Sequence, residues 1–156
     1  MDTYFETAPP PSRVAPSDGR GAWLPARLAG AALCLGVALI HVVDQGGFPG
    51  SKDPGYIAAG YYLLELAAVV AAVLLVRRSA RNGWLLALAV AAGPLLGFVL
   101  TRGPGLPSAT EDRGNWSEPI GVASLVVEGL LLLLCLYARA PRPAGSRDQA
   151  PAATRT

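Results

Sequence analysis

Four long apolar blocks constrain the fold of this 156-residue chain more than any other feature. A helix that crosses the hydrocarbon core of a bilayer needs about 20 mostly apolar residues. The blocks over residues 23–43, 56–76, 84–100 and 120–137 meet or nearly meet that length. The helices of a soluble bundle would keep a polar face, and these blocks have almost none. The sequence therefore predicts an all-α, four-helix transmembrane bundle that runs up-down-up-down.

The basic residues predict the orientation of this bundle, because loops rich in Lys and Arg stay in the cytoplasm. Ten of the thirteen lie in or beside the N-terminal tail, the connection 77–83 and the C-terminal tail. The other two loops hold three, which are Lys52, Arg102 and Arg113. Both termini are therefore expected in the cytoplasm, and four spans require that the termini share a side. The first block lacks a basic n-region and a cleavage site, so we expect a retained span rather than a signal peptide.

The two ends of the chain differ in composition from the apolar blocks. Residues 1–22 and 138–156 are rich in Pro, Ala, Ser and charge, and such segments cannot bury a core. We expect disordered cytoplasmic tails on either side of a single transmembrane domain over residues 23–137. One Lys among thirteen basic residues, with abundant Ala, Gly and Pro, is typical of a high-GC genome and indicates a bacterial plasma membrane.

Two glutamates lie in the middle of apolar blocks, Glu65 in the second and Glu128 in the fourth. A carboxylate at the centre of a bilayer is costly, so it usually faces a bundle interior and marks a functional site. At about 1.5 Å per residue, both lie roughly 12–14 Å below the outer interface. If they meet, they cannot both ionise in a low dielectric and could share a proton. A purely structural hydrogen-bonding role and pairing with another subunit are the alternative interpretations.

More polar residues gather in the outer halves of the predicted spans, beside small residues that let helices approach closely. Gly93 and Gly97 form such a stripe, with Pro94 expected to kink the helix. Nothing comparable leads to the cytoplasmic side, which favours a half-open pocket over a channel. Arg102 is expected to pair with an acid of the outer surface, the candidates being Asp44, Glu111 and Glu118. The predicted outer polar cluster, a candidate site for a ligand or a proton, comprises His41, Asp44, Tyr61, Glu65, Arg102, Glu118 and Glu128.

The sequence lacks the residues that several known kinds of catalytic or binding site require. A di-iron carboxylate bundle uses Glu-x-x-His on two helices, and the chain has one histidine. Cys34 and Cys135 lie inside spans at different depths and form no redox or zinc motif. A G-x-S-x-G elbow and a basic face with interleaved aromatics for nucleic acid are also missing. We therefore predict no catalytic residue, no metal ligand set and no nucleic-acid partner, and the sequence identifies no cofactor.

Two functional hypotheses follow from the cluster. The first is a non-enzymatic membrane module that binds a ligand, an ion or a partner subunit. The second is a proton-coupled redox or metal-handling membrane protein that uses the intramembrane Glu and His side chains. The expected partners are the lipid bilayer and, for so small a chain, a larger membrane complex or a homo-oligomer.

Three short motifs resemble those of a group of uncharacterised small four-span bacterial integral membrane proteins. They are ALIHVV at 38–43, LTRGPGLP at 100–107 and NWSEPIGVASLVVEGLLLLL at 115–134. The group shares Ile-His near the end of span one, Leu-Thr-Arg and Gly-Leu-Pro after span three, and Glu-Pro-x-Gly with a mid-span Glu in span four. The resemblance implies the architecture and highlights His41, Thr101, Arg102, Glu118 and Glu128. The first outer loop lacks the group's Pro-Glu-His stretch, so no metal role is carried over from it.

Overall fold

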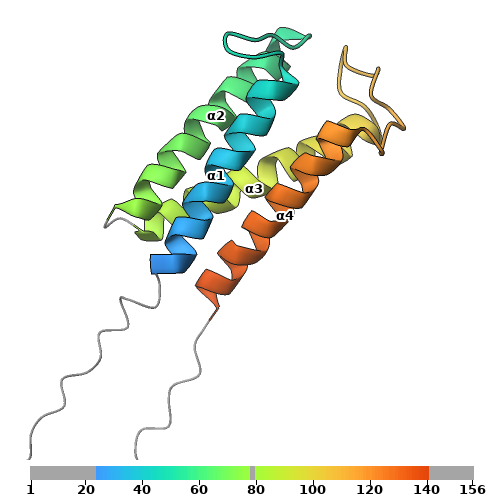
Figure 1. Ribbon diagram of the computed structural model, residues 1–156. Coiled ribbons are helices and arrows are strands. Elements are labelled where there is room, and N and C mark those ends of the chain that lie inside the picture. The colour runs from blue at the N-terminus through green and yellow to red at the C-terminus, as the bar shows by residue number, and fades with distance from the viewer. Residues whose placement is uncertain (1–23, 78–79, 141–156) are drawn as a thin grey trace, which may run out of the picture.

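The protein folds into four helices, as seen in a computed structural model that describes residues 24–77 and 80–140 (Figure 1). The helices are α1 (Leu24–Asp44), α2 (Gly55–Val76), α3 (Ala80–Arg102) and α4 (Pro119–Arg139). Within the described residues the only β structure is one isolated bridge, between Leu106 and Ala109. The all-helical prediction with four helices is confirmed, and each helix is long and apolar enough to cross a membrane.

The predicted span limits agree with the helices to within one or two residues, except at the start of α3. That helix begins at Ala80, so Asn82 and Gly83 lie inside its first turn and do not precede it. Gly83 packs directly on the end of α2, where a Cβ atom would lie 2.9 Å from the backbone nitrogen of Leu75. The glycine therefore serves close helix packing. The two predicted tails lie outside the described residues, apart from residues 138–140, of which 138 and 139 continue α4.

Helix α1 contacts all three other helices. Consecutive helices are neighbours, α1 also packs against α4, and α1 and α3 touch across the bundle. In contrast, α2 and α4 occupy opposite corners and make no close backbone approach. At one end, the Arg27 guanidinium of α1 donates to the last carbonyls of α2, at 2.6 Å to Leu75 and 3.1 Å to Val76. Such carbonyls have no partner within their own helix, so Arg27 ties the start of α1 to the end of α2.

Buried apolar side chains fill only one half of the bundle. They come from the middle of α1, the second halves of α2 and α4, and the first half of α3. The fully buried members include Cys34, Leu75, Ala87, Leu131 and Cys135. Most are small, so the backbones lie close together, as is usual where small residues line a membrane helix interface. The other half of the bundle is not filled in this way. It lies toward the two long loops, residues 45–54 and 103–118, and is called the loop end below.

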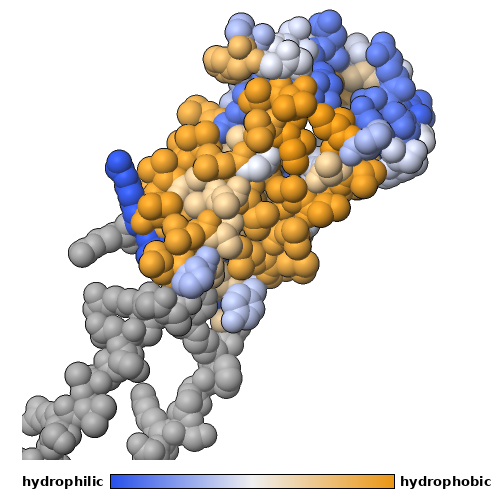
Figure 2. Space-filling view, viewed as in Figure 1, coloured by the Kyte–Doolittle hydropathy of each residue, from blue (hydrophilic) through white to orange (hydrophobic). Residues whose placement is uncertain are grey.

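The outer surface of the bundle is largely apolar on the face seen in Figure 2, with most of the hydrophilic residues at the loop end. Leu39 of α1 is 63% exposed and Leu133 of α4 is 64% exposed, and exposed Leu or Val side chains occur on all four helices. A soluble bundle turns such residues inward, whereas lipid chains solvate them. The four helices are thus compatible with a multi-pass membrane protein.

Candidate functional site

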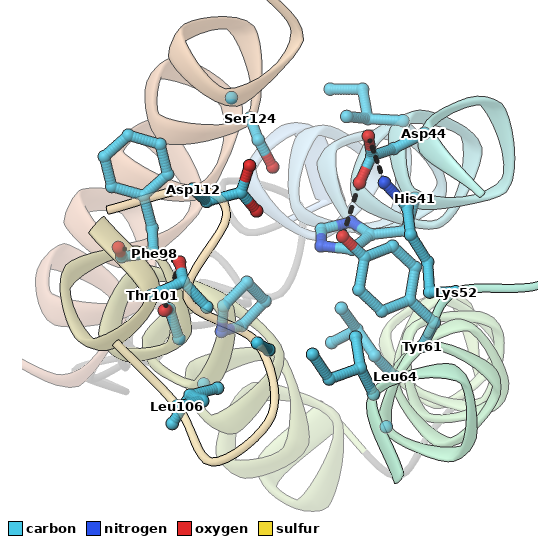
Figure 3. A pocket seen from close by; sticks show the side chains of 18 of the residues that line it. His41, Asp44, Lys52, Tyr61, Leu64, Phe98, Thr101, Leu106, Asp112 and Ser124 are labelled. Carbon is cyan, nitrogen blue, oxygen red and sulfur yellow. Dashed lines mark hydrogen bonds and ion pairs between the residues drawn. The ribbon is translucent and has the colours of Figure 1, made fainter. Parts of the chain in front are cut away.

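A pocket of about 590 Å³ occupies the loop end of the bundle, where the packed core is missing. All four helices and both long loops contribute to its wall. Figure 3 looks into it, with His41, Asp44 and Tyr61 on one side and Phe98, Thr101 and Asp112 on the other. Binding pockets for small molecules commonly measure about 300–1,000 Å³. The polar side chains of the wall include His41, Asp44, Lys52, Tyr61, Thr101, Arg102, Asp112, Glu118, Ser124 and Glu128.

On the α1–α2 side, Asp44 holds two neighbours together. It accepts a hydrogen bond from the hydroxyl of Tyr61, and Lys52 Nζ lies 3.0 Å from its other oxygen. The ring of Tyr61 packs edge-on against His41, with centroids 5.0 Å apart, and Lys52 lies 5.8 Å above the Tyr61 ring. Asp44 is the last residue of α1, so the end of that helix positions the whole group at the mouth of the pocket.

On the α3–α4 side, Arg102 has the corresponding role. Its guanidinium pairs with Glu118, which precedes α4, and lies 3.4 Å from Asp112. It also donates to the hydroxyl of Thr101 at 3.0 Å and stacks 4.6 Å from the centroid of the Phe98 ring. A single side chain therefore joins the end of α3, the following loop and the start of α4.

Deeper in the pocket, Glu128 lies opposite His41. The Ser124 hydroxyl, one turn earlier on α4, donates to Glu128 Oε1 at 2.5 Å. His41 Nε2 is 3.9 Å from the same oxygen, and His41 Nδ1 is 3.0 Å from the backbone oxygen of Val37. The Glu128 side chain is only 1% exposed, which makes it the most buried carboxylate of the pocket.

Glu65 has a different environment. It is absent from the pocket wall, and its Oε1 accepts a hydrogen bond of 2.7 Å from Gln45, just beyond α1. The other polar atom of the Gln45 amide, Oε1, is buried and has no hydrogen-bond partner among the described residues. The structure therefore gives the two glutamates separate partners, in keeping with the distance between α2 and α4.

The glycines of the bundle fall into two groups. At Gly30 and Gly121 a Cβ atom would lie 2.9 Å from Trp84 and 2.8 Å from Phe98, so these glycines permit close packing. At Gly93 and Gly97, which line the pocket, a Cβ atom would meet nothing within 4 Å. The expected close approach along this α3 stripe is therefore not found. The helix continues through Pro94, and Gly93 and Gly97 keep the pocket wide.

The structure brings most of the predicted outer polar cluster together around the pocket and leaves Glu65 outside. Of the acids proposed for Arg102, Glu118 is its partner, while Asp44 binds Lys52 instead. The contributions of Lys52, Asp112 and Gln45 do not follow from the sequence. The first two are charged residues of Gly/Pro-rich loops, where helical periodicity gives no guide. Among the described residues, no group of three or more His, Cys, Asp or Glu side chains could hold a metal ion.

The fold and the pocket define a class, namely a four-helix protein compatible with insertion in a membrane, with a polar-walled pocket at its loop end. Comparison with known proteins does not narrow this class, because no protein-family model, curated protein or solved structure matches the chain.

Proposed function

We propose that the chain is a multi-pass protein of the bacterial plasma membrane, with helices running up-down-up-down and both termini in the cytoplasm. Two observations support this topology. Arg27 links the first turn of α1 to the end of α2, which suits antiparallel neighbours. Arg77, Arg81 and Arg139 belong to that same end by sequence, and basic residues favour the cytoplasm. The loops that form the mouth of the pocket then lie outside.

We further propose that this protein binds a small amphipathic molecule and performs no chemistry on it. The observation that carries this proposal is the pocket itself, whose wall combines polar groups at its mouth and around Glu128 with an apolar part. Leu64, Ala67 and Val90 belong to the apolar part. Sites with mostly apolar walls and a few well-placed polar groups are typical of small-molecule binding.

The pocket has features of a binding site and not of a channel. Its far end is closed by the packed core, in which Leu75, Ala87 and Leu131 have no exposed surface. A flank of the pocket includes Leu63, which is also exposed on the apolar surface of α2. Figure 1 shows α3 diverging from α2 toward the loop end. A ligand in the outer leaflet could enter between these two helices.

Pocket-filling variants test the proposal. Gly97→Leu places a side chain in the open space of the pocket. Gly129→Leu is the matched control, because Gly129 on α4 also has open space around it but does not line the pocket. Native mass spectrometry of the full chain, purified from its own membrane, should detect a bound small molecule in the wild type and in Gly129→Leu. It should be lost in Gly97→Leu. A wild-type protein without any bound molecule, or equal loading of all three proteins, would contradict the proposal.

The contact of His41 with Glu128 favours a second candidate, which is proton-coupled redox or metal handling. Elemental analysis and the visible absorption spectrum of the purified protein separate the two. A stoichiometric metal, or a haem or flavin band that disappears in Glu128→Gln, would favour the second candidate over simple ligand binding.

A further inference from the structure

Glu128 is the deeply buried carboxylate of the pocket, and no permanent cation of the described residues neutralises it. The pocket wall contains two permanent cations, and both are engaged elsewhere. Lys52 binds Asp44, and Arg102 pairs with Glu118 and Asp112. Burying a carboxylate without a partner charge is expensive. A positive group supplied by a ligand would offset that cost.

The imidazole of His41 adds a second requirement, which is a hydrogen-bond donor. Its Nδ1 lies 3.0 Å from the backbone oxygen of Val37, and a carbonyl can only accept, so Nδ1 carries the ring proton. In the neutral ring Nε2 is then an acceptor. Glu128 Oε1 is also an acceptor and lies 3.9 Å away. Its second oxygen, Oε2, makes no hydrogen bond with any described residue. With Glu128 ionised, two acceptors therefore face each other across 3.9 Å, and no described side chain places a donor between them.

An ammonium group satisfies both requirements. A donor nitrogen forms hydrogen bonds at about 2.7–3.2 Å, so one nitrogen can reach two acceptors that are 3.9 Å apart. The pocket wall carries six carboxylates against two permanent cations, and such an excess of one sign concentrates ligands of the opposite charge. The apolar part of the wall can hold a hydrocarbon body of several carbons.

We propose that the pocket binds a lipophilic primary or secondary amine in its protonated form, with the ammonium donating to Glu128 and to Nε2 of His41 and the apolar body lying against Leu64, Ala67 and Val90. This inference rests on the proposed binding function and names its ligand class. A quaternary ammonium group has the charge but no N–H donor, and an alcohol of the same shape has a donor but no charge. These two classes are therefore the natural comparisons.

Binding of matched probes to the full chain in nanodiscs of zwitterionic lipid tests the inference. Equilibrium dialysis with octylamine, octan-1-ol and octyltrimethylammonium compares one hydrocarbon body with three head groups, and empty nanodiscs correct for partition into lipid. We expect octylamine to bind at least about tenfold more tightly than the other two, which corresponds to about 1.4 kcal/mol. Glu128→Gln should remove this preference. Glu65→Gln is the matched control, because Glu65 is a buried glutamate outside the pocket, and it should keep the preference.

The remaining outcomes distinguish a failure of the proposed binding site from a failure of the proposed amine preference. If Gly97→Leu weakens binding of all three probes equally and Glu128→Gln changes nothing, the pocket binds ligands but the amine inference is wrong. If Gly97→Leu and Gly129→Leu both bind the probes as the wild type does, the pocket is not the binding site and both proposals fail. Because Gly97→Leu leaves Glu128 intact, it tests the site even if Glu128→Gln does not fold.

Discussion

Removal of the Arg102 side chain should detach the start of α4 from the end of α3. The Arg102 side chain is 11% exposed and that of Glu118 is 31% exposed, so their ion pair is neither fully buried nor on the surface. Breaking a buried charge pair costs about 2–5 kcal/mol, and an exposed pair is worth about 0–1 kcal/mol. We therefore assign about 1–2 kcal/mol to this pair. Stacking on Phe98 adds about 0.5–1 kcal/mol. The pair with Asp112 adds little, because the Asp112 side chain is 52% exposed.

The Arg102→Ala substitution is thus expected to lower the free energy of unfolding by about 1.5–3 kcal/mol, the sum of these two contributions. Unfolding of the purified protein by increasing mole fractions of a denaturing detergent, followed by far-UV circular dichroism, measures this change. Arg113→Ala is the control, since Arg113 carries the same charge in the loop that follows α3 but pairs with no described acid. A difference between the two variants below about 0.5 kcal/mol, the usual scatter of surface substitutions, would refute the role given to Arg102.

Four further substitutions can be measured in the same assay. Arg27→Gln should cost about 1–2 kcal/mol, because charged hydrogen bonds to the last carbonyls of α2 are lost. Gly121→Ala should cost about 1–3 kcal/mol, since its Cβ would lie 2.8 Å from Phe98. Gly129→Ala, in open space, should be neutral or gain up to about 1 kcal/mol from helix propensity. Glu65→Leu should cost about 1–3 kcal/mol, because the buried amide of Gln45 then loses its hydrogen-bond acceptor. This substitution should leave amine binding unchanged.

The helices could be predicted from the sequence because each needs only local information. An apolar run of about 20 residues has few other solutions. The error at the start of α3 arose because Asn82-Gly83 has the composition of a helix boundary. The actual function of Gly83, close packing against Leu75, depends on a neighbouring helix and is not a local property.

The candidate site was predicted less completely. Depth in a membrane helix follows from residue count, so Glu65 and Glu128 were correctly expected near the middle of their helices. The arrangement of the helices does not follow from residue count. Because α2 and α4 lie at opposite corners, Glu65 turns to Gln45 while Glu128 turns to Ser124 and His41.

The loop contributions could not be predicted, since the positions of Lys52 and Asp112 depend on how Gly/Pro-rich loops fold back over the helix ends. The resemblance to small four-span bacterial membrane proteins remains a prediction. It highlighted His41 and Glu128, which line the pocket together, and Arg102 and Glu118, which form an ion pair.

The proposed topology is the claim on which the outer position of the pocket mouth and the proposed path of a ligand from the outer leaflet depend. Labelling of single cysteines in intact cells with a membrane-impermeant maleimide tests it most directly. Thr110→Cys reports the loop beside the pocket, and Arg77→Cys reports the opposite end. Cys34 and Cys135 are fully buried and should not react. We predict that position 110 is labelled in intact cells and that position 77 is labelled only after permeabilisation. Labelling of both from the same side, or the reverse pattern, would contradict the account.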